Sequence, residues 1–424
     1  MRVLFTTAWY PNRKVAGDGV FIQKHAQAVA RLNDVAVLMV QTDEAKRDHT
    51  IEVEARDASS ELSAGSQGSL QEVLVYVPKT WREIPVLTGL VRMFWLMAGY
   101  LKGYRYIKKH YWQGQRPEVC HVNVLTRAAG LPWLLHKVHG IPYIITEHWS
   151  RYMRQGAYPN SGLQLRLGRR FVRDASFVCP VSLNLEKGMK SWQLDNRHYT
   201  RVSNVVDTDV FCPMVPGQMV PGPLVAGQIE NSPIVQFTHV SWMRDDSKNI
   251  SGILRVLARL KERRQDFNVR LVGEGNDKPM LIALAESLGL TAGQVTFVEA
   301  KRGAALANEL RQSDCLLMFS HFENQPVSVL EALACGRPVI ATQVGAIPGM
   351  LAGNRGVCVP PGDEAALEQA IDAFLTLSAQ MTPQQKADQT LASQRRQYVV
   401  ERHSPEVICR QFDALYRAAR ASNG

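Results

Sequence analysis

Few features of this sequence could cross-link the chain or anchor it. Its seven cysteines are scattered along 424 residues without a C-x-x-C pair. That pattern excludes a disulfide framework and a thiolate zinc site, and it favours reduced thiols in a cytosolic compartment. The first apolar run, up to Ala8, is too short for the core of a signal peptide, and Pro11 and charged residues soon follow. We therefore expect a cytoplasmic protein whose chain begins with a β-strand.

Long apolar runs and signatures of nucleic-acid binding are also scarce. The only membrane-like run, residues 84–101, contains Pro85, Thr88 and Arg92 and is marginal in length for a spanning helix, so we expect a packed or interfacial helix. Lysine and arginine exceed aspartate and glutamate by 49 to 39. This excess weakly favours an anionic partner such as a nucleotide or anionic lipid. Without a stacking motif or a known fold signature, nucleic acid is not expected.

Apolar runs typical of strands alternate with helical patterns along the whole chain. Strands are expected at residues 2–7, 35–40, 73–77, 119–124, 143–146, 177–181, 234–238, 269–272, 295–298, 315–319, 339–342 and 357–359. Continuous apolar strands with helical crossovers indicate parallel sheets covered on both faces. Because the chain is too long for one typical core, we predict an α/β protein with two doubly wound, Rossmann-like domains.

Two polar stretches and a terminal helix complete this organisation. Residues 213–233 have the proline and glycine content of a linker, and we place the border between the domains there. The N-terminal domain is assigned to residues 1–205 and the C-terminal domain to 206–399. Residues 42–68 contain few apolar positions and are interpreted as a loop or insertion. The helical period of residues 405–420 predicts a final helix, about 400–424, that can pack back on the N-terminal domain.

The most informative stretch is residues 319–336. An apolar strand ends there in a polar turn, and Pro326 suits a first helical position, where its missing N–H costs nothing. The amides of Val327 and Ser328 would then point out of the helix mouth, which attracts a phosphate. This pattern predicts an anion site at the start of the helix.

Two glutamates flank that predicted anion site. Glu323 would stand in the loop, and Glu331 a little over one turn inside the helix. Carboxylates accept hydrogen bonds from hydroxyl groups, so the loop could hold an anion between two hydroxyl-bearing groups. Open α/β sheets bind ligands at the carboxyl ends of their strands. The stretch therefore has the pattern needed to bind a sugar nucleotide.

The order of the motifs resembles that of the retaining glycosyltransferases of family 4, or glycosyl transferases group 1, which have the GT-B fold. The strongest likeness is the E-x7-E run that begins at Glu323 and its sequel, E-A-L-A-C-G-R-P-V-I-A-T. Four further motifs of the family match in order, at residues 10–25, 142–148, 202–211 and 271–275. The resemblance covers nearly the full length and implies two domains that face each other across a deep cleft.

The resemblance implies transfer of a sugar from a UDP- or GDP-linked donor to a hydroxyl of a glycan or lipid-linked saccharide, with retention at the anomeric carbon. It implies that Glu323 faces the donor sugar, Glu331 binds the ribose, Lys248 contacts the diphosphate, His148 lies near the reacting centre and Gly19 lets the backbone approach the diphosphate. The donor-binding loop would include Asn324, Gln325, Pro326, Val327 and Ser328.

The chain departs from the family pattern in one functional motif. The usual Gly-Arg after the first strand of the second domain is absent, and residues 239–249 stand in its place. Arg244 matches the arginine only with a spacing shift. A non-catalytic module that binds sugar nucleotides with the same fold therefore remains the alternative.

Two further patterns bear on metals and membranes. Asp207-Thr-Asp209 imitates a metal-binding D-x-D motif, but it falls in the crossover between domains, where an aspartate supports a turn. We therefore predict no catalytic metal and no cofactor besides the donor. A basic and aromatic zone indicates either a surface for anionic lipid or a core helix with a solvated basic face. It comprises Trp95, Tyr100, Lys102, Tyr104, Tyr106, Lys108, Lys109, Trp112, Arg166, Arg169, Arg170 and Arg173.

Overall fold

The computed structural model describes residues 1–15, 17–43, 50–62, 65–79, 85–125, 127–153, 162–213, 234–291, 293–381 and 390–422. The chain forms two compact units, Met1–Val205 with Pro405–Gly424, and Val206–Ser404. The chain passes from the first unit to the second after Val205, where the assigned ranges 1–205 and 206–399 meet, and not within the proline-rich stretch 213–233. Residues 214–233 lie outside the described residues.

The first unit is built on a seven-stranded sheet. Its order is β3 (Glu52–Asp57), β4 (Ser69–Pro78), β2 (Asp34–Asp43), β1 (Arg2–Thr7), β5 (Val119–Asn123), β6 (Tyr143–Glu147) and β7 (Phe177–Pro180). All neighbours pair in parallel except β3 and β4. Val3 lies opposite Val35 on one side and Val119 on the other. These apolar strands are buried on both faces, as a parallel sheet requires.

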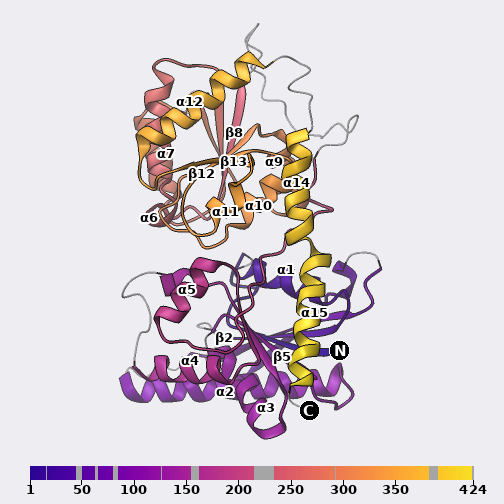
Figure 1. The fold of residues 1–424 in the computed structure, drawn as a ribbon. Helices are drawn as coiled ribbons and strands as arrows, with labels where there is room; N and C mark the ends of the chain where they lie inside the picture. The colour runs from indigo at the N-terminus through magenta and orange to yellow at the C-terminus, as the bar shows by residue number, and fades with distance from the viewer. Residues whose placement is uncertain are drawn as a thin grey trace. The chain divides into compact units, whose positions relative to one another are not determined.

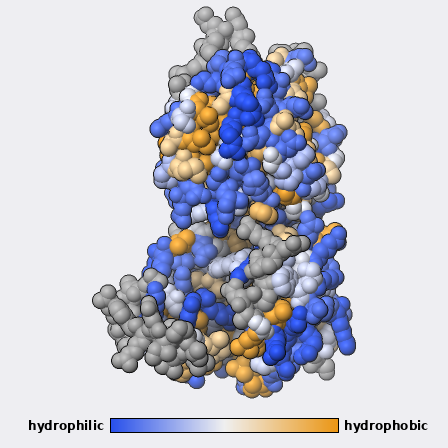
Figure 2. Space-filling view, turned by 90° about the vertical axis from the view of Figure 1, so that its left-hand side faces the viewer, coloured by the Kyte–Doolittle hydropathy of each residue, from blue (hydrophilic) through white to orange (hydrophobic). Residues whose placement is uncertain are grey.

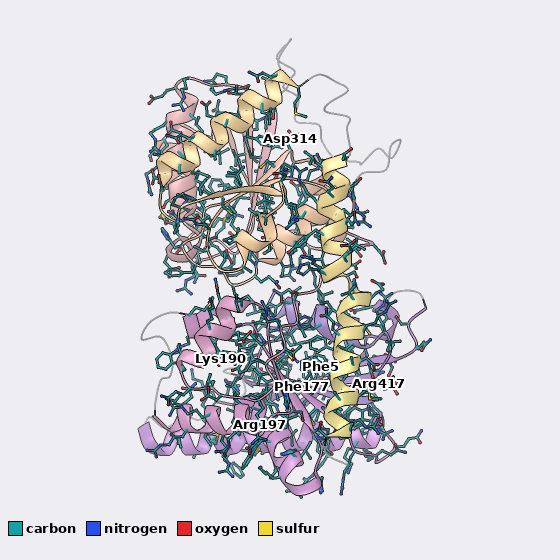
Figure 3. The ribbon with its side chains drawn as sticks, viewed as in Figure 1. Phe5, Phe177, Lys190, Arg197, Asp314 and Arg417 are labelled. Atoms are coloured by element: carbon teal, nitrogen blue, oxygen red, sulfur yellow. The ribbon has the colours of Figure 1, made fainter. Side chains whose placement is uncertain are left out.

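Helices cover both faces of this sheet (Figure 1). One face carries α2 (Pro85–His110), α3 (Gly130–His139), α4 (Gly162–Asp174) and α5 (Leu183–Ser191), and the other carries α1 (Val20–Val29) and α15 (Pro405–Ala421). Short 3₁₀ turns lie at Ser59–Glu61, Arg127–Ala129 and Ser150–Met153. In Figure 3, Phe5 lies in the interior of this unit, whereas Arg417 on α15 points outward. The predicted return of the last helix to the first unit is thus what the structure has.

The edge strand β3 corrects the interpretation of residues 42–68 as a loop. Glu52–Asp57 pairs antiparallel with β4, with Val53 opposite Val75. Val53 and Ala55 pack against the core, while the alternate residues Glu54 and Arg56 are exposed. Charges on an edge strand discourage pairing with other chains, and they also hide the strand from a search for apolar runs.

Helix α2 is largely a core element. Tyr100, Tyr104 and Trp112 are buried in the core beneath the sheet, and Trp95 and Tyr106 pack against it in part. For these aromatic side chains the structure favours the second of the two alternatives, a core helix, over a surface for anionic lipid. Within the described ranges, no helix has both the length and the apolar character that crossing a bilayer requires.

The second unit has an all-parallel, six-stranded sheet. Its order is β10 (Val295–Val298), β9 (Phe267–Val272), β8 (Val235–Val240), β11 (Cys315–Met318), β12 (Val339–Thr342) and β13 (Gly356–Val359). One face carries α7 (Ile250–Lys261), α8 (Lys278–Ser287) and α12 (Glu364–Gln380). The other carries α9 (Gly303–Gln312), α10 (Val327–Ala334), α11 (Ile347–Leu351) and α14 (Thr390–His403) (Figure 1). The strand order reverses between β8 and β11, where open sheets bind ligands.

Candidate active site

The loops after β8 and β11 meet at the reversal point of the second-unit sheet. A short helix, α6 (Asp245–Lys248), follows β8 and ends on Lys248. The Lys248 Nζ donates to Glu323 Oε1 at 2.6 Å, and the Ser320 hydroxyl donates to the same oxygen at 2.8 Å. The Glu323 side chain is 8% exposed and that of Lys248 21% exposed. Two of the predicted site residues, 75 positions apart, are therefore in direct contact.

Backbone contacts hold the Glu323 loop in place. The His321 N–H donates to the Ser247 carbonyl at 2.9 Å, and the Thr342 hydroxyl donates to the Ser320 carbonyl at 2.7 Å. Gly345 has a φ of +56°, and a Cβ there would lie 2.2 Å from the Glu323 carbonyl oxygen. Only glycine fits this position, so the turn after β12 packs directly against the backbone of the Glu323 loop.

Helix α10 begins directly after this loop. Pro326 is its N-cap, with a φ of −68°. The prediction placed it at the first helical position, one residue later in the helix. The Pro326 side chain makes no capping hydrogen bond, and Val327 and Ser328 form the first turn. Glu331 lies inside the helix and is only 5% exposed, so it is not a solvated surface glutamate.

The other predicted residues of this unit have separate surroundings. Asn324 and Gln325 are half-buried, and the Asn324 carbonyl accepts from the Ala346 N–H at 2.7 Å. Arg244 caps α6 on the solvent side, where its 62% exposed side chain pairs with Asp246 at 2.8 Å. The Arg244 carbonyl accepts the Lys248 N–H at 2.9 Å, whereas the hydrogen bond of its side chain goes to Asp246 and not to Glu323.

His239 opens the stretch that stands in place of the usual Gly-Arg motif, and its role is structural. It is fully buried, with Nδ1 2.9 Å from the Leu317 carbonyl oxygen and Nε2 2.7 Å from the Ser241 hydroxyl. Burial lowers the pKa of His239 to about 4, which keeps the ring neutral. The histidine therefore ties the end of β8 to β11 and fixes the loop that leads to Lys248.

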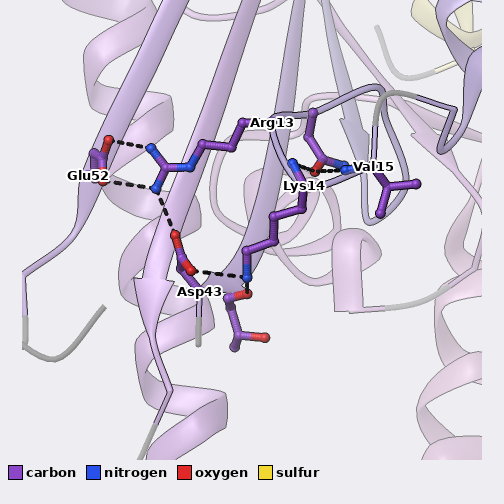
Figure 4. A network of polar contacts seen from close by, with 7 residues as sticks. Arg13, Lys14, Val15, Asp43 and Glu52 are labelled. Carbon is purple, nitrogen blue, oxygen red and sulfur yellow. Dashed lines mark hydrogen bonds and ion pairs between the residues drawn. The ribbon is translucent and has the colours of Figure 1, made fainter. Parts of the chain in front are cut away.

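In the first unit, the loop after β1 is fixed by ion pairs at the carboxyl edge of the sheet (Figure 4). Arg13 bonds Asp43 Oδ2 and Glu52 Oε1, both at 2.7 Å, and Lys14 Nζ lies 3.1 Å from Asp43 Oδ1. The Arg13 guanidinium also stacks 3.8 Å above the ring of Tyr76. This network joins the loop to β2, β3 and β4.

Gly19 ends the same loop at the start of α1. Its φ of +62° is left-handed, and a Cβ would lie 2.5 Å from the Trp9 carbonyl oxygen. The backbone of this glycine thus packs directly on the chain that leaves β1. This close packing requires glycine by itself, and the predicted approach to a diphosphate remains a prediction.

His148 directly follows β6 and belongs to a buried cluster of rings. Its ring centroid lies 4.5 Å from that of Phe21 and 5.1 Å from that of His25. Burial is the largest cause that lowers the pKa of His148 well below its usual range, and the neighbouring His25 and His121 lower it further. A hydrogen bond with Asn204 has the opposite, smaller effect. The imidazole is therefore neutral at physiological pH.

Glu147, which was not among the predicted site residues, holds the backbone of His148 in position. Its fully buried carboxylate accepts the N–H groups of His148 at 2.9 Å, Trp149 at 2.8 Å and Leu125 at 2.8 Å. Burial raises the pKa of Glu147 to about 7, although the three N–H donors oppose this shift. An acidic residue at the end of an apolar strand, next to a candidate histidine, was the signal that could have revealed it.

The Asp207-Thr-Asp209 motif supports a turn, as expected. Asp207 Oδ1 accepts the N–H of Asp209 at 3.1 Å and that of Val210 at 3.2 Å. Within the described part of the chain, no cluster of three or more histidine, cysteine or acidic residues is arranged to hold a metal ion.

The second-unit site combines complementary chemical functions. Lys248 is a cation for an anionic ligand, the mouth of α10 presents backbone amides, and Glu323 is an acceptor for hydroxyl groups. Such a set suits a ligand that carries both phosphate and hydroxyls.

Family models match both units. Residues 19–205 match the glycosyl transferase 4-like domain, and residues 237–391 match the glycosyl transferases group 1. The structure is similar over 99% of both chains to the sucrose-phosphate synthase of Thermosynechococcus elongatus, with a TM-score of 0.70 at 18% identity. It is also similar to Anabaena HepE in complex with UDP-glucose, with a TM-score of 0.65 at 16% identity and coverage of 99% and 100%. The fold is therefore GT-B.

Relatives found by sequence also include glycosyltransferases. The N-acetyl-alpha-D-glucosaminyl L-malate synthase of Bacillus anthracis is 24% identical over 308 residues, which are 72% of this chain and 75% of that protein. The D-inositol 3-phosphate glycosyltransferase of Gordonia bronchialis is 28% identical over 59% of this chain and 54% of its own length, so the match spans about half of that relative. The chain belongs to the GT-B glycosyltransferases of the family 4 type.

Proposed function

We propose that this glycosyltransferase moves a sugar from a UDP- or GDP-linked donor to a glycan or lipid-linked saccharide, with retention of the anomeric configuration, in the assembly of cell-surface polysaccharide. The contact between Lys248 and Glu323 at the mouth of α10 supports this best. It puts a cation for the diphosphate beside an acceptor for the sugar hydroxyls. Intact Glu323, Glu331 and Lys248 argue against a non-catalytic module with the same fold.

The proposed reaction breaks the bond between the anomeric carbon and the diphosphate oxygen and forms one from that carbon to the acceptor oxygen. The leaving phosphate gains charge and takes the proton of the acceptor hydroxyl. Lys248 and the amides of Val327 and Ser328 can stabilise that charge, since fixed donors act strongly in a site shielded from water. We propose that no metal ion is needed for this step. Activity should then persist in EDTA, and a requirement for added magnesium or manganese would contradict the proposal.

A donor screen tests the proposed function. Purified protein is assayed with UDP-, GDP- and ADP-linked sugars for thermal stabilisation and for slow release of the sugar. A donor that gives both supports an enzyme, and the anomeric proton coupling in the NMR spectrum of the product reports retention or inversion. If no donor stabilises the protein or is turned over, the proposal fails. Stabilisation without any turnover would instead favour the binding module.

Variants at the site test the proposed roles. Lys248→Ala should lower kcat with the identified donor by about 100-fold, since removal of one stabilising donor costs on the order of 10²–10³. Glu323→Gln should also lower kcat. His148→Ala should lower kcat too, if the predicted place of this residue near the reacting centre is right. Full activity in Lys248→Ala would refute the assignment of that residue.

We further propose that the first unit contacts an anionic membrane surface through α4. Leu163 is 65% and Leu167 40% exposed, and the exposed Arg166 and Arg170 lie on the same helix. Arg166, Arg169, Arg170 and Arg173 line a groove of about 410 Å³. Figure 2 shows apolar next to hydrophilic side chains at the end of this unit that carries α2, α3 and α4. Such a helix suits a lipid interface.

Co-sedimentation with liposomes tests this surface. The protein should bind vesicles that contain phosphatidylglycerol at low salt, and Leu163→Ser with Leu167→Ser should weaken the binding. Equal recovery with neutral phosphatidylcholine vesicles would remove the electrostatic part of the proposal. No binding at low salt would remove the membrane contact altogether.

A further inference from the structure

Two aromatic rings are exposed at the carboxyl edge of the second-unit sheet. Trp242 follows β8 and is 54% exposed, and Phe322 follows β11 and is 48% exposed. β8 and β11 are neighbouring parallel strands at the point where the strand order reverses. Both rings therefore leave the same edge that carries Lys248 and Glu323.

The loop that carries Trp242 is held rigidly on both sides of the ring. The Ser241 hydroxyl bonds His239 Nε2 at 2.7 Å, and the Met243 N–H donates to the Glu274 carbonyl at 2.6 Å. The Met243 side chain is fully buried. Both neighbours of Trp242 are thus anchored in the fold while its side chain is exposed, so the backbone that carries the ring is held in place.

The Phe322 ring is linked to the same framework. Its N–H lies 3.5 Å from the Ser247 carbonyl, which also accepts the His321 N–H, and the next residue is Glu323. Ser247 belongs to α6, which continues the Trp242 loop. Phe322 thus directly precedes the predicted acceptor of sugar hydroxyls, and Trp242 lies in the neighbouring loop at the same edge of the sheet.

We propose that Trp242 and Phe322 form a stacking subsite for the pyranose ring of the donor sugar. This inference rests on the proposed function. A pyranose has hydroxyls around its rim and C–H groups on its faces, so a carboxylate can bind the rim while an aromatic ring covers one face and removes apolar surface from water. A nucleobase would also stack, but we expect the base near residues 298–302, at the end of β10, and β9 separates that strand from β8.

Calorimetric titration of the full chain tests the subsite. UDP, GDP, UDP-glucose, UDP-N-acetylglucosamine and GDP-mannose are the probes, and the proteins are the wild type, Trp242→Ala, Trp242→Phe and Phe322→Leu. Leu377→Ala, which removes a 58% exposed side chain from α12, is the matched control. Circular dichroism checks the fold of each variant.

For the sugar nucleotide that the wild type binds, Trp242→Ala should raise the Kd about tenfold, and Phe322→Leu should raise it less. Both should leave the Kd of the free nucleoside diphosphate within twofold. Trp242→Phe should recover most of the loss. If Trp242→Ala affects nucleotide and sugar nucleotide equally, or neither, the subsite is refuted while the proposed function stands. If the wild type binds none of the probes, the proposed function fails and the subsite with it.

Discussion

Removal of the Glu147 carboxylate should loosen two loops of the first unit at once. The carboxylate is fully buried and accepts three backbone N–H groups, from Leu125 after β5 and from His148 and Trp149 after β6. A buried donor left without a partner costs about 1–3 kcal/mol. Glu147→Ala should therefore lower the free energy of unfolding of the first unit by about 3 kcal/mol or more.

Glu147→Gln separates the hydrogen bonds from the charge. The amide keeps one oxygen, which can still accept the N–H groups of His148 and Trp149, but its NH₂ cannot accept the N–H of Leu125. One bond is lost, so the cost should be about 1–3 kcal/mol. Because the His148 loop keeps its main support, the glutamine variant should retain more glycosyltransferase activity than the alanine variant.

The pH dependence gives this prediction a sharper test. The pKa of Glu147 rises from 4.5 to about 7 in the folded protein, so the fold binds this proton more tightly than the unfolded chain does. The resulting stabilisation is fully present below pH 4.5 and is lost as the pH rises through 7. Between pH 7.5 and 5.5, the wild type should gain roughly 2 kcal/mol relative to Glu147→Gln, which cannot titrate.

Calorimetric thermal unfolding of the wild type, Glu147→Gln and Glu147→Ala at several pH values provides the measurement. Other titrating groups are common to the three proteins and cancel in the differences. An alanine variant with an unchanged Tm would refute the proposed role of the three hydrogen bonds. A constant difference in stability between the wild type and the glutamine variant across this pH range would refute the raised pKa.

Three further substitutions test the surroundings of the site. Gly345→Ala places a Cβ 2.2 Å from the Glu323 carbonyl oxygen, so it should lower both Tm and donor affinity, whereas Gly349→Ala, with no atom within 4 Å, should leave donor affinity unchanged; equal donor Kd values for the two variants would contradict the packing argument. Asp207→Ala removes the acceptor for two turn N–H groups and should lower the free energy of unfolding by about 1 kcal/mol, without creating or abolishing any response to divalent metal. Arg244→Ala breaks only a solvent-exposed ion pair and should change the stability by less than about 1 kcal/mol, so a larger loss in urea unfolding would reveal contacts beyond Asp246.

The sequence by itself determined the architecture and the main candidate site. The alternation of apolar strands with helical periods indicated two parallel α/β sheets, because strands buried on both faces must be apolar throughout. The run from β11 into α10 contains a polar turn and a proline that mark the start of the helix, so Glu323 and Glu331 could be named as candidate site residues without a structure. These signals are local, and local patterns can be read from neighbouring residues alone.

Only the tertiary structure decided which distant groups meet. It paired Lys248 with Glu323, packed α15 against α1, and buried Tyr100 and Trp112 under the sheet rather than on a surface. It also revealed β3 as an edge strand that pairs with β4. Because one face of β3 is charged, its sequence has no continuous apolar run that would mark it as a strand.

The buried carboxylate of Glu147 is the clearest case of this difference. A glutamate at the end of a strand looks like an ordinary polar terminus, and nothing in its sequence neighbours fixes its burial. Its role arises because the chain places three backbone donors from two loops around one carboxyl group. Sequence patterns tell which face of an element is apolar, but the partners of a polar group depend on segments that the fold brings together.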